Sequence, residues 1–436
     1  MATVTLISLG CSKNRIDSEQ MLAVLADHGY RIVQDPAKAE VIIVNTCGFI
    51  QASKEEAIST LFEMAEYKTA GCCKVLAATG CFAQRYPEAI YEEMPEVDLI
   101  MGVYEYEKLD QALTQAAEGQ RRVYTDDDES FFEYRRILTT PSYSAYIRIG
   151  EGCDNFCAFC AIPLIRGRYR SRPEADILEE VKTLAERGVK EFTLIAQDTT
   201  RYGSDLTGGE GQLPELLEHV ADIPGVEWLR VLYCYPERVD ERLVQAMCRH
   251  PNICPYIDMP MQHISQQVLD AMNRAETGVH IREVCRMLKE NGIAIRTTLM
   301  VGFPGETETD FEELKAFVRE MAFDRMGAFI FSPEEGTAAA EMDNPVPPET
   351  AQARYDELMT LQHGISLENN RARIGQVCTV LVERRRGKRY TGRSMYEAPE
   401  IDGNIYFTAK ETLTPGQFIQ VRITGAKAYD LMGEQI

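Results

Sequence analysis

Histidine is scarce in this sequence, with six residues among 436, and the six are scattered along the chain. That distribution offers neither a histidine-rich metal site nor an evident nucleophile–base pair. Long apolar runs are also lacking. The run at residues 4–10 is short and no basic segment precedes it, so it does not resemble a secretory signal. No stretch is long enough to span a bilayer, and we expect a soluble, cytoplasmic protein with no membrane partner.

Positive charge is in short supply as well. There are 46 Lys and Arg residues against 68 Asp and Glu, which gives a net charge of −22. The deficit is uneven, because residues 371–436 carry 11 basic and 7 acidic side chains and residues 1–370 therefore sum to −26. An acidic body disfavours extended contact with a phosphate backbone and suits a basic partner. A solvated surface that serves only solubility is the alternative.

Cysteine, by contrast, is plentiful and odd in number, with 13 residues. Without an export signal, metal ligands or free thiols explain it better than disulfides do. Cys153, Cys157 and Cys160 share one short segment, "EGCDNFCAFCAIP", with three and then two residues between them. Structural zinc takes four ligands, whereas three thiolates can bind three irons of a four-iron cluster and leave the fourth iron open. A zinc site with a distant fourth ligand remains the alternative.

Residues 1–125 predict an α/β domain with an open parallel sheet. Apolar runs at 4–10, 41–46 and 74–80 are typical of buried parallel strands, and the amphipathic stretches 18–29 and 53–67 of helices. We expect the first helix to end at Gly29 and the second to begin at an N-cap, Ser53, with Glu56 three residues later.

A cysteine follows each of these three strands: Cys11, Cys47 and Cys81. Because the carboxyl ends of parallel strands share one edge of a sheet, we expect the three thiols to converge there. The alternative is that they are merely small apolar residues at strand ends. Cys72 and Cys73 break the pattern and receive no assignment.

The acidic run at 125–130 predicts a linker to a second domain at 140–345. Six apolar strands separated by helical stretches such as 174–188 and 308–321 predict a partial (β/α)6 barrel, similar to a TIM barrel. The six expected strands are 145–150, 192–198, 228–234, 256–262, 295–302 and 326–333. The three-cysteine loop follows the first of them, where a barrel places its chemistry. Gly152 would permit a tight loop, and Phe159 could cover a cluster from water.

The last segment predicts a small antiparallel β-barrel over residues 371–436, after a polar helix at roughly 350–370. The turn "DGN" (402–404) favours short strands joined by glycine turns. The basic run "RRRGKR" (384–389) indicates either an RNA contact or a solvated hairpin. It keeps open a second class of function, a non-catalytic metal-containing protein that binds RNA.

Together these motifs resemble a known family. The Cys153, Cys157, Cys160 spacing at the first strand of a β/α barrel is similar to the radical S-adenosylmethionine (SAM) superfamily. With Cys11, Cys47 and Cys81 ahead of it and a small barrel behind, the chain resembles the methylthiotransferases. The segments "GCDNFCAFCAIPLIRGRYRSRP", "QDTTRYG" and "GRSMYEAPEIDG" resemble the branch that modifies ribosomal protein S-twelve. The branch that modifies an adenosine of transfer RNA is the alternative.

This resemblance implies two [4Fe-4S] clusters, a TRAM-type carboxy-terminal barrel with an OB-like fold, and a sulfur-transferring reaction. The cluster on Cys153, Cys157 and Cys160 would pass one electron to SAM and so generate a 5′-deoxyadenosyl radical, which removes hydrogen from the β-carbon of an aspartate. The cluster on Cys11, Cys47 and Cys81 would deliver a methylated sulfur and give 3-methylthio-aspartate. The implied partners are ribosomal protein S-twelve or the small ribosomal subunit, and a one-electron donor such as flavodoxin or ferredoxin.

Weaker signals concern the SAM site and the remaining thiols. Gly302, in "VGFPGETE", could let an adenine ring approach the backbone, and Gln197 and Arg296 could contact the methionine carboxylate or the ribose. His263 is as well explained as a packed histidine as by proton transfer. We expect the remaining cysteines on apolar stretches to be core thiols: Cys234, Cys248, Cys254, Cys285 and Cys378.

Overall fold

The computed structural model describes residues 2–126 and 133–436. Most of the predicted linker at 125–130 therefore lies outside the described residues. The chain divides into two compact units, which are described separately. The first contains residues 1–139, 150–172 and 332–340, and the second contains residues 140–149, 173–331 and 341–436. The three-cysteine loop thus belongs to the same unit as the amino-terminal sheet.

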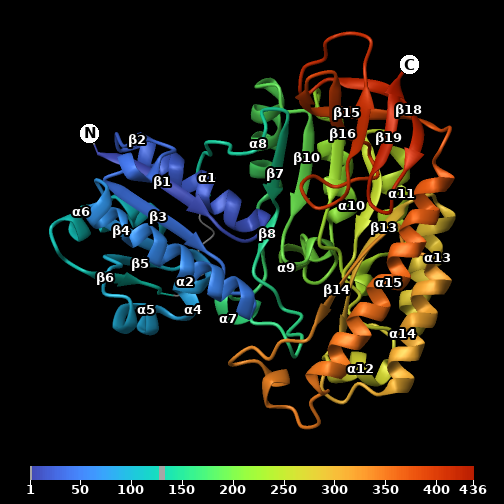
Figure 1. Ribbon diagram of the computed structural model, residues 1–436, viewed down its shortest axis with the longest axis horizontal. Coiled ribbons are helices and arrows are strands. Elements are labelled where there is room, and N and C mark those ends of the chain that lie inside the picture. Colours follow the sequence, from blue (N-terminus) through green and yellow to red (C-terminus); the bar gives the residue numbers. More distant parts are fainter. Residues whose placement is uncertain (1, 127–132) are drawn as a thin grey trace. The chain divides into compact units, whose positions relative to one another are not determined.

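The first unit is built on a six-stranded sheet in the order β2-β1-β3-β4-β5-β6, in which every neighbouring pair is parallel (Figure 1). This confirms the predicted parallel α/β sheet. The strand order reverses beside β1, so that β1 and β3 flank a topological switch point, the place where such sheets bind ligands. The strands are β1 (Thr3–Ser8), β2 (Arg31–Ile32), β3 (Val41–Thr46), β4 (Val75–Thr79), β5 (Leu99–Met101) and β6 (Arg122–Tyr124).

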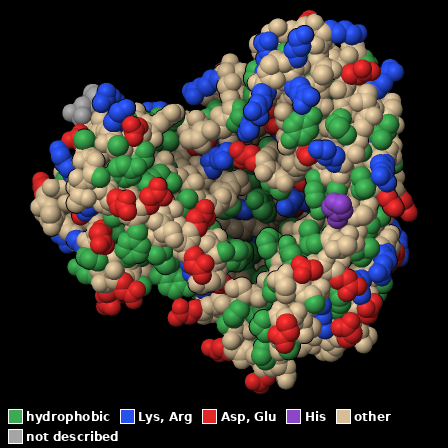
Figure 2. All heavy atoms as spheres, viewed as in Figure 1, with side chains coloured by type: hydrophobic (Ala, Val, Ile, Leu, Met, Phe, Trp, Pro, Cys, Tyr) green, Lys and Arg blue, Asp and Glu red, His purple; other side chains and the backbone are tan. Residues whose placement is uncertain are grey.

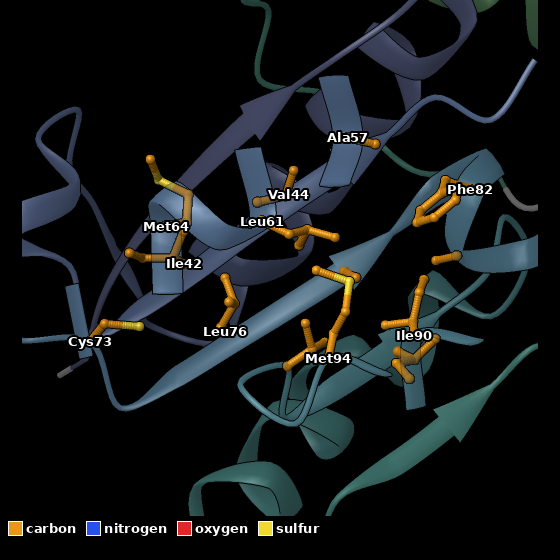
Figure 3. Packing of buried hydrophobic residues seen from close by; sticks show 14 of the residues in the cluster. Ile42, Val44, Ala57, Leu61, Met64, Cys73, Leu76, Phe82, Ile90 and Met94 are labelled. Atoms are coloured by element: carbon orange, nitrogen blue, oxygen red, sulfur yellow. The ribbon is translucent and has the colours of Figure 1, made fainter. Parts of the chain in front are cut away.

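Helices cover both faces of this sheet because its strands alternate between two buried sides. Ile42 and Val44 of β3 face one way and pack against Leu61 of α2 (Figure 3). Val41 and Ile43 face the other way, with Met21 of α1. The helices of this unit are α1 (Ser12–Asp27), α2 (Gln51–Ala65), α3 (Tyr67–Ala70), α4 (Gly80–Arg85), α5 (Pro87–Glu93), α6 (Leu109–Ala117) and α7 (Ile162–Arg166).

Two predicted helix starts are wrong. Helix α1 begins at Ser12 rather than at 18, because its polar first turns are buried and hydrogen-bonded at the sheet edge instead of being a surface loop. Helix α2 begins at Gln51, with Ile50 and not Ser53 at the N-cap position. The Ser53 amide already donates to the Ile50 carbonyl, so the predicted capping box does not form.

The second unit contains the predicted partial barrel. Its six parallel strands run in the order β14-β13-β12-β11-β10-β7, with β7 and β14 at the edges. Helices α13, α14 and α15 flank the β13–β14 side (Figure 1). The strands are β7 (Ser144–Arg148), β10 (Glu191–Ile195), β11 (Trp228–Val231), β12 (Ile253–Asp258), β13 (Ala294–Val301) and β14 (Arg325–Ile330). The helices are α8 (Glu174–Glu186), α9 (Ser204–Thr207), α10 (Leu213–Ala221), α11 (Glu241–Arg249), α12 (Gln266–Ala271), α13 (Gly278–Glu290), α14 (Glu308–Met321) and α15 (Pro348–Ala372).

The carboxy-terminal segment closes into a five-stranded barrel, as predicted, around a core that includes Val380, Ile405 and Val421. One detail differs: β17 and β19 pair in parallel, so the barrel is not wholly antiparallel. β18 lies between β17 and β19 in the chain, so no hairpin joins these two strands and forces them to run in opposite directions. The strands are β15 (Val377–Arg386), β16 (Arg389–Arg393), β17 (Ile405–Thr408), β18 (Phe418–Ala426) and β19 (Leu431–Gln435).

Two of the five expected core thiols are not in the core. Cys234, Cys254 and Cys285 are fully buried, whereas Cys248 is exposed and Cys378 is only half-buried. Cys248 lies in the last turn of α11, on the side of the helix that is exposed to solvent. None of the helices in the described ranges is long and apolar enough to cross a membrane.

Candidate iron–sulfur centre

The three strand-end cysteines meet at the switch point of the first sheet. Cys11 is the N-cap residue of α1, Cys47 follows β3, and Cys81 lies in the first turn of α4. A Cβ atom added at Gly10 would lie only 2.8 Å from Cys47 Cβ and 3.1 Å from Cys47 Sγ, so glycine is required where the first two loops touch. Cys11 and Cys47 also lie close enough to Cys81 for negative charge on either to raise its pKa.

Asn14 holds the three loops together from the first turn of α1, where its side chain is fully buried. Its Nδ2 donates to the Leu9 carbonyl at 3.1 Å and to the Thr46 carbonyl at 2.9 Å. Its Oδ1 accepts from the Cys81 thiol at 3.4 Å. One carboxamide thereby binds the chain just before Cys11, just before Cys47, and Cys81 itself.

Arg166 is the second buried polar side chain at this point. It is the last residue of α7, a few residues after the Cys153–Cys160 loop, and is only 2% exposed. Its guanidinium donates to Asp17 Oδ2 at 2.8 Å and to Glu151 Oε2 at 3.1 Å. It also donates to Asn14 Oδ1 at 2.9 Å and to Cys81 Sγ at 3.4 Å.

Cys47 and Cys81 do not have the low pKa of a free nucleophilic thiol. Burial raises the pKa of Cys81 to about 12, while the positive charge of Arg166 opposes that rise. Burial also raises the pKa of Cys47. Thiols of high pKa stay protonated at neutral pH until a metal takes the place of the proton.

An apolar wall closes the centre on one side. Cys81 packs with Val103 and Tyr104, which follow β5, and with Ala161 and Ile165 of the segment after the second cysteine loop. All five residues are at most 8% exposed. The wall therefore excludes water from Cys81 and attaches the second loop to the amino-terminal sheet.

The second loop brings Cys153, Cys157 and Cys160 together. A Cβ added at Gly152 (φ +77°) would lie 2.0 Å from the Arg168 carbonyl oxygen, so this position requires glycine, as expected from the sequence. The Cys153 amide donates to the Gly167 carbonyl at 3.1 Å. Burial raises the pKa of Cys160 strongly, and the nearby Cys157 and Cys153 raise it further.

The segment 332–340, which follows β14, supports both cysteine loops. Glu334 is buried and pairs with Lys54 of α2 and Arg85 of α4, each at 2.9 Å. Arg85 also donates to the Gly48 carbonyl, next to Cys47, at 3.0 Å. The Ala339 amide donates to the Ala158 carbonyl, inside the second loop, at 2.8 Å.

The donor sets fit two iron–sulfur clusters. Each set consists of three thiols from one small region, with glycines where loops approach closely and buried polar groups behind the first set. In the part of the chain that the structure describes, no group of three or more His, Cys, Asp or Glu side chains is arranged to hold one metal ion. Thiolates of a four-iron cluster each bind a different iron and need not converge on one point.

The residues predicted to lie at the cofactors, Phe159 over the cluster and three others at SAM, fall in different environments, and these roles stay predictions. Phe159 is half-buried in the second loop, and Gln197 is half-buried two residues after β10. Arg296 of β13 is held by carboxylates of its own unit, Asp258 at 2.5 Å and Asp402 at 3.7 Å.

Gly302 follows β13 and has φ +76°. A Cβ there would lie 2.7 Å from the Ala351 Cβ atom, so the close approach seen in the structure is to α15. Its amide donates to the Glu306 carboxylate. The need for glycine is thus explained by packing alone, and contact with an adenine ring stays a prediction.

His263 has the character of a packed histidine. It is fully buried, and its Nδ1 accepts from the Ser265 amide at 3.1 Å. Burial lowers its pKa to about 4, so the ring is neutral at physiological pH.

Sequence patterns did not reveal Asn14, Asp17, Arg166, Arg85 or Glu334. Each is a polar residue on a segment that could equally lie at the surface, and its burial depends on partners far away in the chain. The only local hint is that Asn14 and Asp17 fall within the first turns after Cys11, and that Arg166 ends the short helix after Cys160.

Comparisons with known proteins agree with this arrangement. Residues 3–102 match the family described as "Uncharacterized protein family UPF0004", residues 147–318 match the "Radical SAM superfamily", and residues 374–436 match the "TRAM domain". The chain is 49% identical to the ribosomal protein uS12 methylthiotransferase RimO of Desulforamulus reducens, over 100% of this chain and 99% of that protein. It is 46% identical to the RimO protein of Clostridioides difficile, with the same two coverages.

Solved structures resemble the fold at lower identity. The radical SAM methyltransferase TsrM from Kitasatospora setae, solved with cobalamin and a [4Fe-4S] cluster, aligns with a TM-score of 0.57 at 16% identity. The alignment covers 78% of this chain and 74% of TsrM. The cobalamin-dependent radical enzyme OxsB gives a TM-score of 0.51 at 13% identity, covering 84% of this chain and 56% of OxsB.

Proposed function

Since the chain belongs to the ribosomal protein uS12 methylthiotransferases of the radical SAM superfamily, we propose that it attaches a methylthio group to the β-carbon of an aspartate in uS12. The product would be a 3-methylthio-aspartate residue. The observation that carries the proposal is the meeting of Cys11, Cys47 and Cys81 at one sheet edge, in the same compact unit as the Cys153–Cys160 loop.

Each thiol set has a distinct place in this proposal. Cys11, Cys47 and Cys81 would hold one [4Fe-4S] cluster, and Cys153, Cys157 and Cys160 the other. When bound together with SAM, these groups supply the electron, the radical and the methylated sulfur that an unactivated C–H bond requires.

The chain's own residues position and shield these groups. Asn14 fixes the spacing of the first thiol set by binding the backbone before Cys11 and before Cys47. Ala161 and Ile165 keep water from Cys81, and water exclusion protects reactive intermediates from side reactions. No general acid or base is needed for hydrogen removal, which agrees with a neutral, packed His263.

Charge supports a basic protein substrate. Residues 1–370 sum to −26, whereas Lys and Arg side chains gather over the carboxy-terminal barrel on the face shown in Figure 2. In this barrel the run Arg384–Arg386 is exposed. A ribosomal protein is basic because it binds RNA, so the acidic surface would attract it, most strongly at low salt. The basic barrel would then face ribosomal RNA of the small subunit in the cytoplasm.

The experiment is an anaerobic assay with SAM, a reductant such as reduced flavodoxin or ferredoxin, and either purified uS12, small subunits or transfer RNA. Mass spectrometry should find one methylthio group on an aspartate of uS12 and none on transfer RNA. The matched control is Cys72→Ala, which removes an exposed thiol outside both sets and should leave product formation unchanged. If an adenosine of transfer RNA is modified and uS12 is not, the alternative function, methylthiolation of transfer RNA, would replace this proposal. Binding without cleavage of SAM would favour the non-catalytic protein.

A further inference from the structure

The buried guanidinium of Arg166 joins the two thiol sets through a single side chain. It comes from the segment that carries Cys153, Cys157 and Cys160, yet its Nη2 lies 3.4 Å from Sγ of Cys81 in the other set. Two carboxylates, Asp17 and Glu151, and the Asn14 oxygen occupy its other contacts.

Burying these charges has a large cost in free energy if the ion pairs serve only to stabilise the fold. Removing charges from water carries a large penalty, and packed apolar side chains often replace a buried ion pair with no loss of stability. The ions here are almost fully shielded, since the Arg166 side chain is 2% exposed and that of Asp17 is 1% exposed.

We propose that Arg166 is a positioning residue that sets the reduction potential of the cluster held by Cys11, Cys47 and Cys81. The inference rests on the proposed function, because it requires a cluster at that site. Reduction adds one electron, and a positive charge and an N–H donor at a ligand sulfur favour the reduced form. Hydrogen bonds to sulfur, net charge and solvent exposure are the means by which proteins tune such clusters.

Asp17 acts in the opposite direction on the same cluster. Its carboxylate neutralises Arg166 at 2.8 Å, so it limits how far the positive charge raises the potential. The pair therefore holds the potential at an intermediate value. Removing either partner should shift that value, and the two shifts should have opposite signs.

The test is an EPR-monitored titration with dithionite, which donates one electron per cluster. The full chain carries Cys153→Ala, Cys157→Ala and Cys160→Ala, so that only the first cluster contributes. In this background R166Q should lower the midpoint potential, R166K should lower it less, and D17N should raise it. The control R135Q removes an exposed arginine that pairs with Asp27, and it should leave the potential unchanged.

A merely structural role predicts lower thermal stability in both variants without shifts of opposite sign. Equal potentials, or shifts in the same direction, with iron content retained, overturn the inference. If R166Q binds no iron, the midpoint potential of D17N is the test: a raised potential supports the inference, and an unchanged potential overturns it. A parent chain without iron at this site overturns both this inference and the cluster assignment above. Opposite shifts in this background, together with failure of the chain that keeps all six cysteines to modify uS12, overturn the substrate proposal alone.

Discussion

Arg393, the last residue of β16, forms a two-pronged ion pair with Glu191, the first residue of β10, at 2.9 and 2.7 Å. Both side chains are buried, and Arg230 of β11 lies 3.7 Å from the same carboxylate. Although burial by itself raises the pKa of Glu191, Arg393 and Arg230 reverse the effect and hold it below its usual value. The carboxy-terminal barrel is thus fixed to the partial barrel by charge inside one compact unit.

Replacing Arg393 by Met should therefore destabilise the second unit. The substitution leaves the Glu191 carboxylate buried without its bidentate partner, a loss that typically costs about 3–5 kcal/mol. Urea unfolding followed by circular dichroism would measure it. The matched control is Arg389→Met at the other end of β16, an exposed position where about 0.5 kcal/mol or less is expected. Equal effects of the two substitutions would contradict the assignment.

Asn14→Ala should weaken both the amino-terminal sheet and its iron site. The substitution leaves the Leu9 and Thr46 carbonyls without the carboxamide donor, and buried unsatisfied groups cost about 1–3 kcal/mol each. We expect a lower unfolding temperature and less iron per chain after reconstitution. Gln51→Ala, which removes an exposed hydrogen bond to Glu55, is the control and should change neither. Normal iron content in the Asn14 variant would show that the loops keep their spacing without it.

Removal of one thiol set should leave the other loaded. With Cys11, Cys47 and Cys81 replaced by Ala, about half of the iron should remain, because separate thiolate sets bind separate clusters. That variant should still cleave SAM to 5′-deoxyadenosine but form no methylthio product. The complementary variant of Cys153, Cys157 and Cys160 should keep the other half of the iron and lose SAM cleavage altogether. Loss of all iron from either variant would contradict two independent sites.

His263 should make stability depend on pH between about 6.5 and 4. Burial lowers its folded-state pKa from 6.5 to about 4, so in this window the unfolded chain binds a proton that the folded chain does not. The contribution of neutral His263 to the free energy of unfolding is fully present above pH 6.5. It is lost as the pH falls toward 4, and the loss is about 3 kcal/mol at most.

Urea unfolding of His263→Gln and of the wild type at several pH values would check this. The difference between the two chains should shrink as the pH falls, whereas His28→Gln, at an exposed position, should follow the wild type throughout. A difference that stays constant with pH would mean that His263 has the same pKa in the folded and the unfolded chain.

The sequence by itself determined the architecture and the grouping of six cysteines into two sets of three. In runs such as Val41–Thr46, apolar residues point to both sides of the strand, a pattern typical of a strand that is covered on two faces. Each of Cys11, Cys47 and Cys81 takes the same place after its strand. The spacing of Cys153, Cys157 and Cys160 is equally local, so short-range pattern was enough to predict a loop that leaves one iron open. The first residue of α1 could not be predicted in this way. The polar residues at the beginning of this helix have the pattern of a loop, and they are buried only because of partners that are remote in the chain.

Only the tertiary structure decided what surrounds those cysteines. Arg166 and Cys81 are 85 positions apart in the chain, and Arg393 and Glu191 are 202 positions apart. A buried arginine and a solvated one have the same local pattern, since what distinguishes them is the partner that replaces water. That partner is set by strand order and loop packing, which place the β1 and β3 ends side by side and bring α7 against the amino-terminal sheet. The two cysteine sets could therefore be predicted from short-range patterns, whereas the buried polar groups around them depend on contacts that exist only once the chain has folded.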